Sequence, residues 1–188
     1  MTRQISGLMV ALLVSACAFT PHEVEISATA PKSESTIGAG VTVALQVIDD
    51  RESTVVGQRG AGMLDADITV KDILSVLNTE LTEGLKANGF KVGVPGSTAD
   101  AEIEVRLRAL KFFIESGFFT GAENTSVVLA VEAEKRGQDF DRTYRSSSEK
   151  RTIFIPGGGS IDAKLNAALT DVLGRIVRDR KLLDFLAG

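Results

Sequence analysis

The chain has 188 residues, a length that suits one globular domain better than two. It carries 21 Lys and Arg against 25 Asp and Glu, and this acidic balance predicts no binding to nucleic acid, whose partners usually present a basic face. One Cys and one His exclude an intramolecular disulfide, Cys-rich zinc sites and multi-His metal centres, so we expect no metal and no cofactor.

The first 16 residues have the composition of a secretory signal peptide. Arg3 precedes an uncharged apolar run over residues 7–16 that ends in small side chains. A membrane-spanning helix needs about 20 apolar residues, and this run is only about half that length. The only cysteine, Cys17, follows the run directly.

The string Leu13-Val-Ser-Ala-Cys17 resembles a bacterial lipobox. The resemblance implies cleavage between Ala16 and Cys17 and transfer of a diacylglyceryl group to the Cys17 thiol, so that acyl chains hold the mature protein on a membrane. The alternative is an unmodified cysteine, because single cysteines are often inert. Ala18 follows the cysteine, whereas Asp at this position resembles an inner-membrane retention signal, so we expect the periplasmic side of the outer membrane.

Residues 17–40 are rich in small and turn residues and show no helical period. We interpret them as a flexible tether, with room for a short edge strand over residues 22–26. A single domain over residues 41–188 follows the tether.

The domain begins with an alternating apolar pattern that predicts a strand over residues 41–48. Thr69-Val-Lys-Asp72 resembles a capping box, and an apolar stripe through Leu77, Leu81 and Leu85 predicts a helix that ends at Asn88-Gly89. A short strand is expected over residues 90–94.

Three longer strands are predicted over residues 101–114, 125–134 and 139–148. In the first, Glu102, Glu104 and Arg106 lie on the face opposite Ile103 and Val105. A later shift of the apolar phase to Leu110 and Phe112 indicates a bulge or a strand end that is covered on both faces. The other two are joined by Lys135-Arg-Gly-Gln138, which suits an antiparallel hairpin. Last, Ser160 is expected to cap a helix with the stripe Ile161, Leu165, Leu169 and Leu173.

These patterns predict an α+β fold with two layers. We expect a mostly antiparallel sheet of about five strands, two helices packed on one face, and a more polar second face.

The chain resembles the YajG-type family of uncharacterised bacterial lipoproteins. The resemblance rests on the lipobox, the strand over residues 41–47, and the strings Ala87-Asn-Gly-Phe-Lys-Val-Gly93, Arg142-Thr-Tyr-Arg-Ser-Ser147 and Asp184-Phe-Leu186. It implies an outer-membrane lipoprotein of unknown activity, and it supplies no catalytic residues.

The residues themselves also favour a protein that is not an enzyme. His22 lies in the predicted tether, and Ser146-Ser-Ser148 has no partner base, so no catalytic triad is expected. Asp65, Asp67 and the pair Asp49-Asp50 are better explained as solvated loop residues than as a cation site.

Two functions remain open at this point. The first is a non-catalytic binding or scaffold module that contacts an envelope protein or peptidoglycan. Its contact would be the polar sheet face or Phe118 and Phe119, which lie between Gly117 and Gly121 at a predicted hairpin tip and otherwise belong to the core. The second is a carrier of a small ligand or lipid, with a cavity between sheet and helices.

Overall fold

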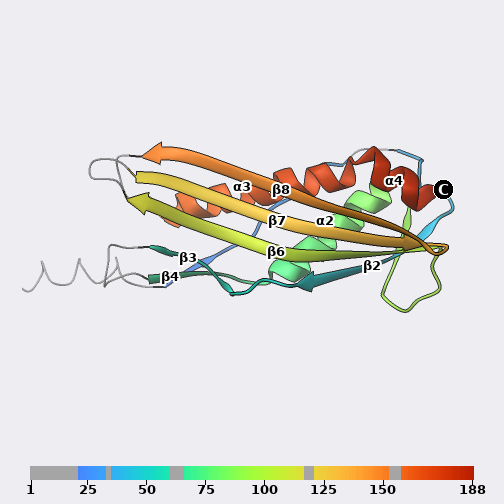
Figure 1. Cartoon of the computed structure of the whole chain (residues 1–188), viewed down its shortest axis with the longest axis horizontal. Coiled ribbons are helices and arrows are strands. Elements are labelled where there is room, and N and C mark those ends of the chain that lie inside the picture. The colour runs from blue at the N-terminus through green and yellow to red at the C-terminus, as the bar shows by residue number, and fades with distance from the viewer. Residues whose placement is uncertain (1–20, 33–34, 60–65, 117–120, 153–157) are drawn as a thin grey trace, which may run out of the picture.

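The computed structural model describes residues 21–32, 35–59, 66–116, 121–152 and 158–188. These described residues form eight strands, arranged in two mixed sheets, and three helices (Figure 1). The predicted α+β class is correct. The prediction of one mostly antiparallel sheet of about five strands is wrong, because a second sheet is present and both sheets contain parallel pairs.

The larger sheet has five strands in the order β5-β2-β6-β7-β8. They are β2 (Thr42–Asp49), β5 (Lys91–Gly93), β6 (Ala101–Ser116), β7 (Gly121–Lys135) and β8 (Gln138–Thr152). β6, β7 and β8 pair antiparallel, as predicted for the last two. β2 runs parallel to both of its neighbours because helix α2 (Ile73–Ala87) carries the chain back before β5, and parallel pairs need such a crossover.

The smaller sheet has three strands in the order β1-β4-β3. It consists of β1 (His22–Val24), β3 (Val55–Arg59) and β4 (Ala66–Val70). β3 lies against β6, where any side chain at Gly57 would collide with the carbonyl oxygen of Phe112. Glycine is therefore required for this close approach of two backbones.

Helices α2 and α3 (Gly158–Val177) cover one face of the larger sheet, and the short helix α4 (Arg180–Ala187) ends the chain. Their predicted apolar stripes are buried in one core cluster with the strands. The predicted capping box is wrong: Asp72 has a φ of 50° and makes no side-chain cap bond, and Val70 belongs to β4. The C-terminal helix is also split, because α3 ends at Val177 and Asp179 caps α4.

The predicted bulge in β6 is confirmed. The pairing with β7 shifts between Leu107 and Ala109, which leaves Arg108 as the extra residue. The shift explains why the buried positions move from Leu107 to Leu110 and Phe112.

The described part of the predicted tether, residues 21–32, is packed on the domain rather than free. Every second side chain is buried, namely Val24, Ile26, Ala28 and Ala30. The backbone N–H of Ala30 donates to Glu80 of α2 (2.7 Å), and that of Ser27 donates to Asn166 of α3 (2.7 Å). The tether prediction is therefore wrong for these residues, because their small apolar side chains and backbone are held by both helices.

Candidate functional site

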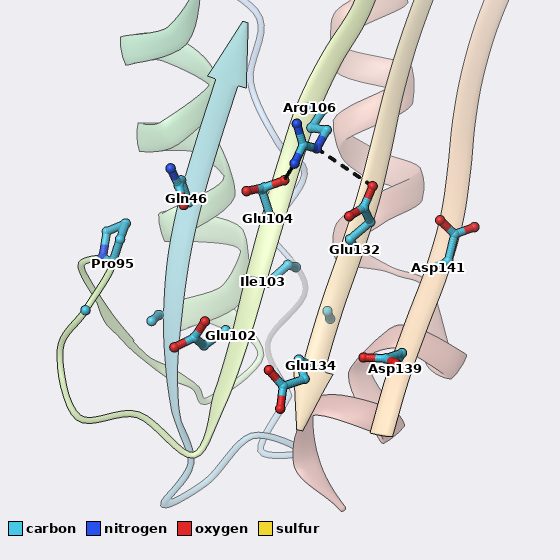
Figure 2. A pocket seen from close by; sticks show the side chains of 13 residues that line it. Gln46, Pro95, Glu102, Ile103, Glu104, Arg106, Glu132, Glu134, Asp139 and Asp141 are labelled. Carbon is cyan, nitrogen blue, oxygen red and sulfur yellow. Dashed lines mark ion pairs between the residues drawn. The ribbon is translucent and has the colours of Figure 1, made fainter. Parts of the chain in front are cut away.

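The face of the larger sheet opposite the helices carries two rows of carboxylates near the β7–β8 turn (Figure 2). The strand register sets residues from β6, β7 and β8 side by side in each row. Glu102, Glu134 and Asp139 form the first row, and Glu104, Glu132 and Asp141 form the second. Because facing Cβ atoms in antiparallel strands lie only about 5 Å apart, the six carboxylates share one small surface.

Arg106 borders the second row. Its Nη2 contacts the Glu104 carboxylate, and its Nε lies 3.7 Å from Oε1 of Glu132 (Figure 2). Among the described residues that line this surface, Arg106 is the only basic one. None of the ion pairs among the described residues involves the first row.

The carboxylates line a hollow of about 690 Å³ whose opposite rim is formed by Gln46 of β2 and the loop at Pro95-Gly96. Figure 2 shows this loop standing away from the sheet beside β2. The neighbouring Val94 is 71 % exposed, more than any other large hydrophobic side chain of the described residues. The site thus combines negative charge with the apolar ring of Pro95 on its rim.

The arrangement lowers the stability of the isolated domain. Like charges directly opposite each other on a sheet destabilise it by about 0.2–1 kcal/mol per pair, and the first row contains two such pairs, whereas Arg106 offsets those of the second row. Where a protein keeps an arrangement that costs stability, the position is typically functional. The rows are therefore suited to bind a group of positive charge.

The same sheet face carries both signs of charge farther from the turn. Lys111 of β6 and Arg145 of β8 occupy it beyond the bulge, and Arg108 pairs there with Asp50. Glu149 of β8 also lies there, so the face is acidic at its turn end and mixed in charge along the distal parts of β6 and β8.

A second polar cluster joins β8 to α4. Asp179 accepts hydrogen bonds from the Tyr144 hydroxyl (2.6 Å), from Arg142 and from the backbone N–H of Lys181 (3.0 Å). Burial alone would raise the pKa of Asp179, but the hydrogen bonds from Tyr144 and Arg142 outweigh it and hold this pKa below its ordinary value. Burial and the neighbouring Asp179 raise the pKa of Tyr144, which therefore remains a proton donor. This cluster fixes the C-terminal helix.

The other polar residues that the sequence analysis considered for catalysis or cation binding lie apart from one another, each with a partner of its own. His22 lies in β1, where its Nε2 is 2.6 Å from Oδ1 of Asp162. Asp49 binds Arg51 through two hydrogen bonds of 2.7 Å, and Asp67 accepts one of 3.0 Å from Gln58. Within the described part of the chain, no group of three His, Cys, Asp or Glu is placed to hold a metal ion.

Four predicted site residues lie outside the described residues. They are Ala16 and Cys17 at the expected cleavage and lipidation site, and Phe118 and Phe119 at the expected partner contact. These predictions remain predictions.

Sequence reasoning found Glu102 and Glu104 as polar strand residues but did not combine them with the four carboxylates of β7 and β8. An available signal was the repeated pattern of an acid at every second position on both sides of the Lys135-Arg-Gly-Gln138 turn. The alignment of the rows on β6 also depends on strand register, which the pattern of one strand does not supply.

No helix that the structure describes has the length and apolar character needed to cross a membrane.

Comparisons with known proteins agree with this fold. A crystal structure of an uncharacterised protein matches with 12 % identity and a TM-score of 0.55, covering 85 % of this chain and 98 % of the other. Protein XCC0632 from Xanthomonas campestris matches with 11 % identity and a TM-score of 0.52, covering 83 % and 91 %. None of the curated proteins compared with the chain matches it.

A family model described as an uncharacterised lipoprotein matches residues 28–187, nearly the whole described domain. The resemblance inferred from the sequence is thereby confirmed, and the chain belongs to the YajG family of uncharacterised lipoproteins.

Proposed function

We propose that this lipoprotein is a non-catalytic binding module of the bacterial envelope that holds a basic segment of another envelope protein in the hollow beside β6, β7 and β8. The observation that carries the proposal is the pair of carboxylate rows on an uncovered sheet face. Their mutual repulsion is relieved when positive charge approaches, so a Lys- or Arg-rich segment gains more there than at an ordinary acidic surface.

The chemistry of the hollow favours a protein partner over peptidoglycan. Peptidoglycan stems carry carboxylates of their own, and these are repelled by the six carboxylates. Pro95, which lines the hollow, adds an apolar contact beside the charges, which matches a peptide segment that alternates basic and apolar side chains.

The second candidate function, a carrier of a lipid or small ligand, needs space between the sheet and the helices. Large side chains lie in that layer with no exposed surface, namely Leu77, Leu107, Leu129, Leu165 and Leu169. The hollow described above lies on the opposite face of the sheet. These observations favour the binding module.

We further propose that acyl chains on Cys17 anchor the protein to the periplasmic side of the outer membrane. Membership of a lipoprotein family supports a membrane anchor, and the lipobox and Ala18 support the site and the choice of membrane. Two or three acyl chains hold a protein on a bilayer almost permanently, because each buried methylene contributes about 0.8 kcal/mol.

The proposal is tested by photo-crosslinking in intact cells. A photoreactive amino acid replaces Gln46, an exposed residue lining the hollow, and in a control it replaces Asn78, an exposed residue of α2. We expect the probe at position 46 alone to capture a protein, which mass spectrometry identifies and whose cross-linked peptide is rich in Lys or Arg.

The same probe is then combined with Glu132→Gln and Glu134→Gln. Loss of the cross-link in this variant supports the acidic rows as the binding element. Capture of peptidoglycan fragments, equal capture from both probe positions, or an unchanged cross-link in the neutralised variant contradicts the proposal.

A further inference from the structure

The outer edge of β8 is a long row of backbone groups with no partner strand in the described structure. β8 is the last strand of the larger sheet, and its 15 residues pair with β7 in one uninterrupted register (Figure 1). It contains no proline and no bulge, two of the features that commonly protect sheet edges, so that its protection consists of charged side chains, whereas the opposite edge, β5, has three residues. Apart from the regular ladders, the described backbone hydrogen bonds involve no residue of β8.

The hairpin geometry shows which residues of β8 direct their backbone groups outward. Lys135 and Gln138 flank a two-residue turn in which Arg136 and Gly137 both have positive φ angles, of 52° and 75°. In such a turn the flanking pair exchanges both hydrogen bonds, so Gln138 faces β7 and every second residue from Asp139 onward faces away. These odd-numbered residues also carry the side chains of the open sheet face.

We propose that this edge pairs antiparallel with the same edge of a second copy of the chain, about a two-fold axis at Thr143. The pairing would join two five-stranded sheets into one continuous sheet, with both open faces on the same side. This inference does not depend on what the acidic hollow binds.

Charge complementarity favours one register. An axis at Arg142 sets Asp139 opposite Arg145, but it also brings two Arg142 side chains together on the other face of the sheet. With the axis at Thr143, Asp141 lies opposite Arg145 of the second copy, the reciprocal pair repeats this contact, and the two Thr143 side chains face each other. An axis at Arg145 sets two arginines together and Asp141 against Glu149, and an axis at Asp141 sets two aspartates together. Asp141 and Arg145 are both exposed, and neither forms an ion pair with another described residue.

The test is a disulfide formed across the axis by the full-length lipoprotein in cells. Hydrogen-bonded neighbours in antiparallel strands have Cα atoms about 5.5 Å apart, which lies within the range that a disulfide spans. We expect Thr143→Cys to give a covalent dimer that is sensitive to reductant. The unsubstituted protein, whose only cysteine is Cys17, provides the background.

The matched control is Ser147→Cys, an exposed position on the same face of the same strand. In the proposed register, the two cysteines at position 147 lie four residues on either side of the axis and about 27 Å apart. A disulfide cannot join them at that distance. Absence of a covalent dimer from Thr143→Cys, or equal cross-linking of both variants, overturns the proposal.

A second measurement does not require a new cysteine. Sedimentation of the detergent-solubilised lipoprotein should show a dimer whose association constant falls about tenfold or more with Arg145→Asp, because the repulsive pair occurs twice. Adding Asp141→Arg to that variant should restore the dimer. A monomer at all concentrations, or no recovery in the double variant, also overturns the proposal.

Discussion

Asp179→Ala should destabilise the domain by about 3 kcal/mol, because this one side chain holds α4 against β8. The Asp179 carboxylate is only 9 % exposed. It caps α4 through the Lys181 N–H and accepts hydrogen bonds from Tyr144 and Arg142. Alanine removes all three interactions and leaves the buried Tyr144 hydroxyl without this acceptor.

The magnitude follows from the separate contributions. Loss of an N-cap costs about 1 kcal/mol. Loss of a hydrogen bond between a buried hydroxyl and a charged group costs about 1.5–3 kcal/mol. Arg142 adds little, because its side chain is 37 % exposed and solvent screens its charge.

The effect should depend on pH. The pKa of Asp179 in the folded protein lies below its ordinary value of 3.8, so its contribution to stability is fully present above that value and is lost as the pH falls through the folded pKa. The difference in unfolding free energy between the unsubstituted domain and Asp179→Ala should therefore be constant near neutral pH and shrink below about pH 4.

Urea denaturation followed by circular dichroism measures both effects in the full chain carrying Cys17→Ser, which we expect to be free of acyl chains. The matched control is Glu83→Ala, because Glu83 forms an exposed ion pair with Lys86 one turn along α2. This control should lose less than about 1 kcal/mol. Equal losses in the two variants, or a difference that persists unchanged into acid, would refute the reasoning.

Three further changes test the anchor, the core and the acidic rows. Cys17→Ser should release the protein from the membrane fraction, and its retention after a high-salt wash would contradict lipid anchoring. Leu77→Ala and Leu169→Ala should each cost about 2–5 kcal/mol in urea denaturation, because both side chains are fully buried between helix and sheet, and losses below about 0.5 kcal/mol would reject their place in the core. Glu134→Gln should stabilise the domain by about 0.5 kcal/mol at low ionic strength, because Glu134 lies between Glu102 and Asp139. A loss of stability would show that the carboxylates of the first row do not repel one another.

The elements that sequence reasoning located correctly are those with a strong period of their own. The apolar stripes of α2 and α3 and the alternation along β2, β7 and β8 are local patterns, and the helices and strands lie where these patterns predict them. The bulge at Arg108 was also detectable, because it displaces the apolar phase within one strand.

The missed features depend on contacts between distant segments. Residues 24–30 alternate in burial, but half of the buried positions are alanines, and their burial depends on α2 and α3, which come much later in the chain. The parallel pairing of β2 with both β5 and β6, and the alignment of Glu102 with Glu134, likewise follow from register across the sheet. Local patterns carry no information about such pairings.

The packing of residues 21–32 determines how far the domain can move from its anchor. If Cys17 carries the acyl chains, three residues separate it from Pro21, and the four steps between the two Cα atoms span about 14 Å at most. The small sheet containing β1 is then held beside the bilayer. The β7–β8 turn lies at the other end of the molecule (Figure 1), and a strand of 15 residues such as β8 is about 50 Å long.

With the proposed anchor at Cys17, a single copy on this short connection would be able to stand upright, with its acidic rows directed away from the bilayer. Two copies joined through β8 have their anchored ends on opposite sides of the two-fold axis. Both connecting segments would then reach the bilayer only when the strands lie along its surface. Association of two copies would therefore turn the domain from an upright orientation on the membrane to a flat one.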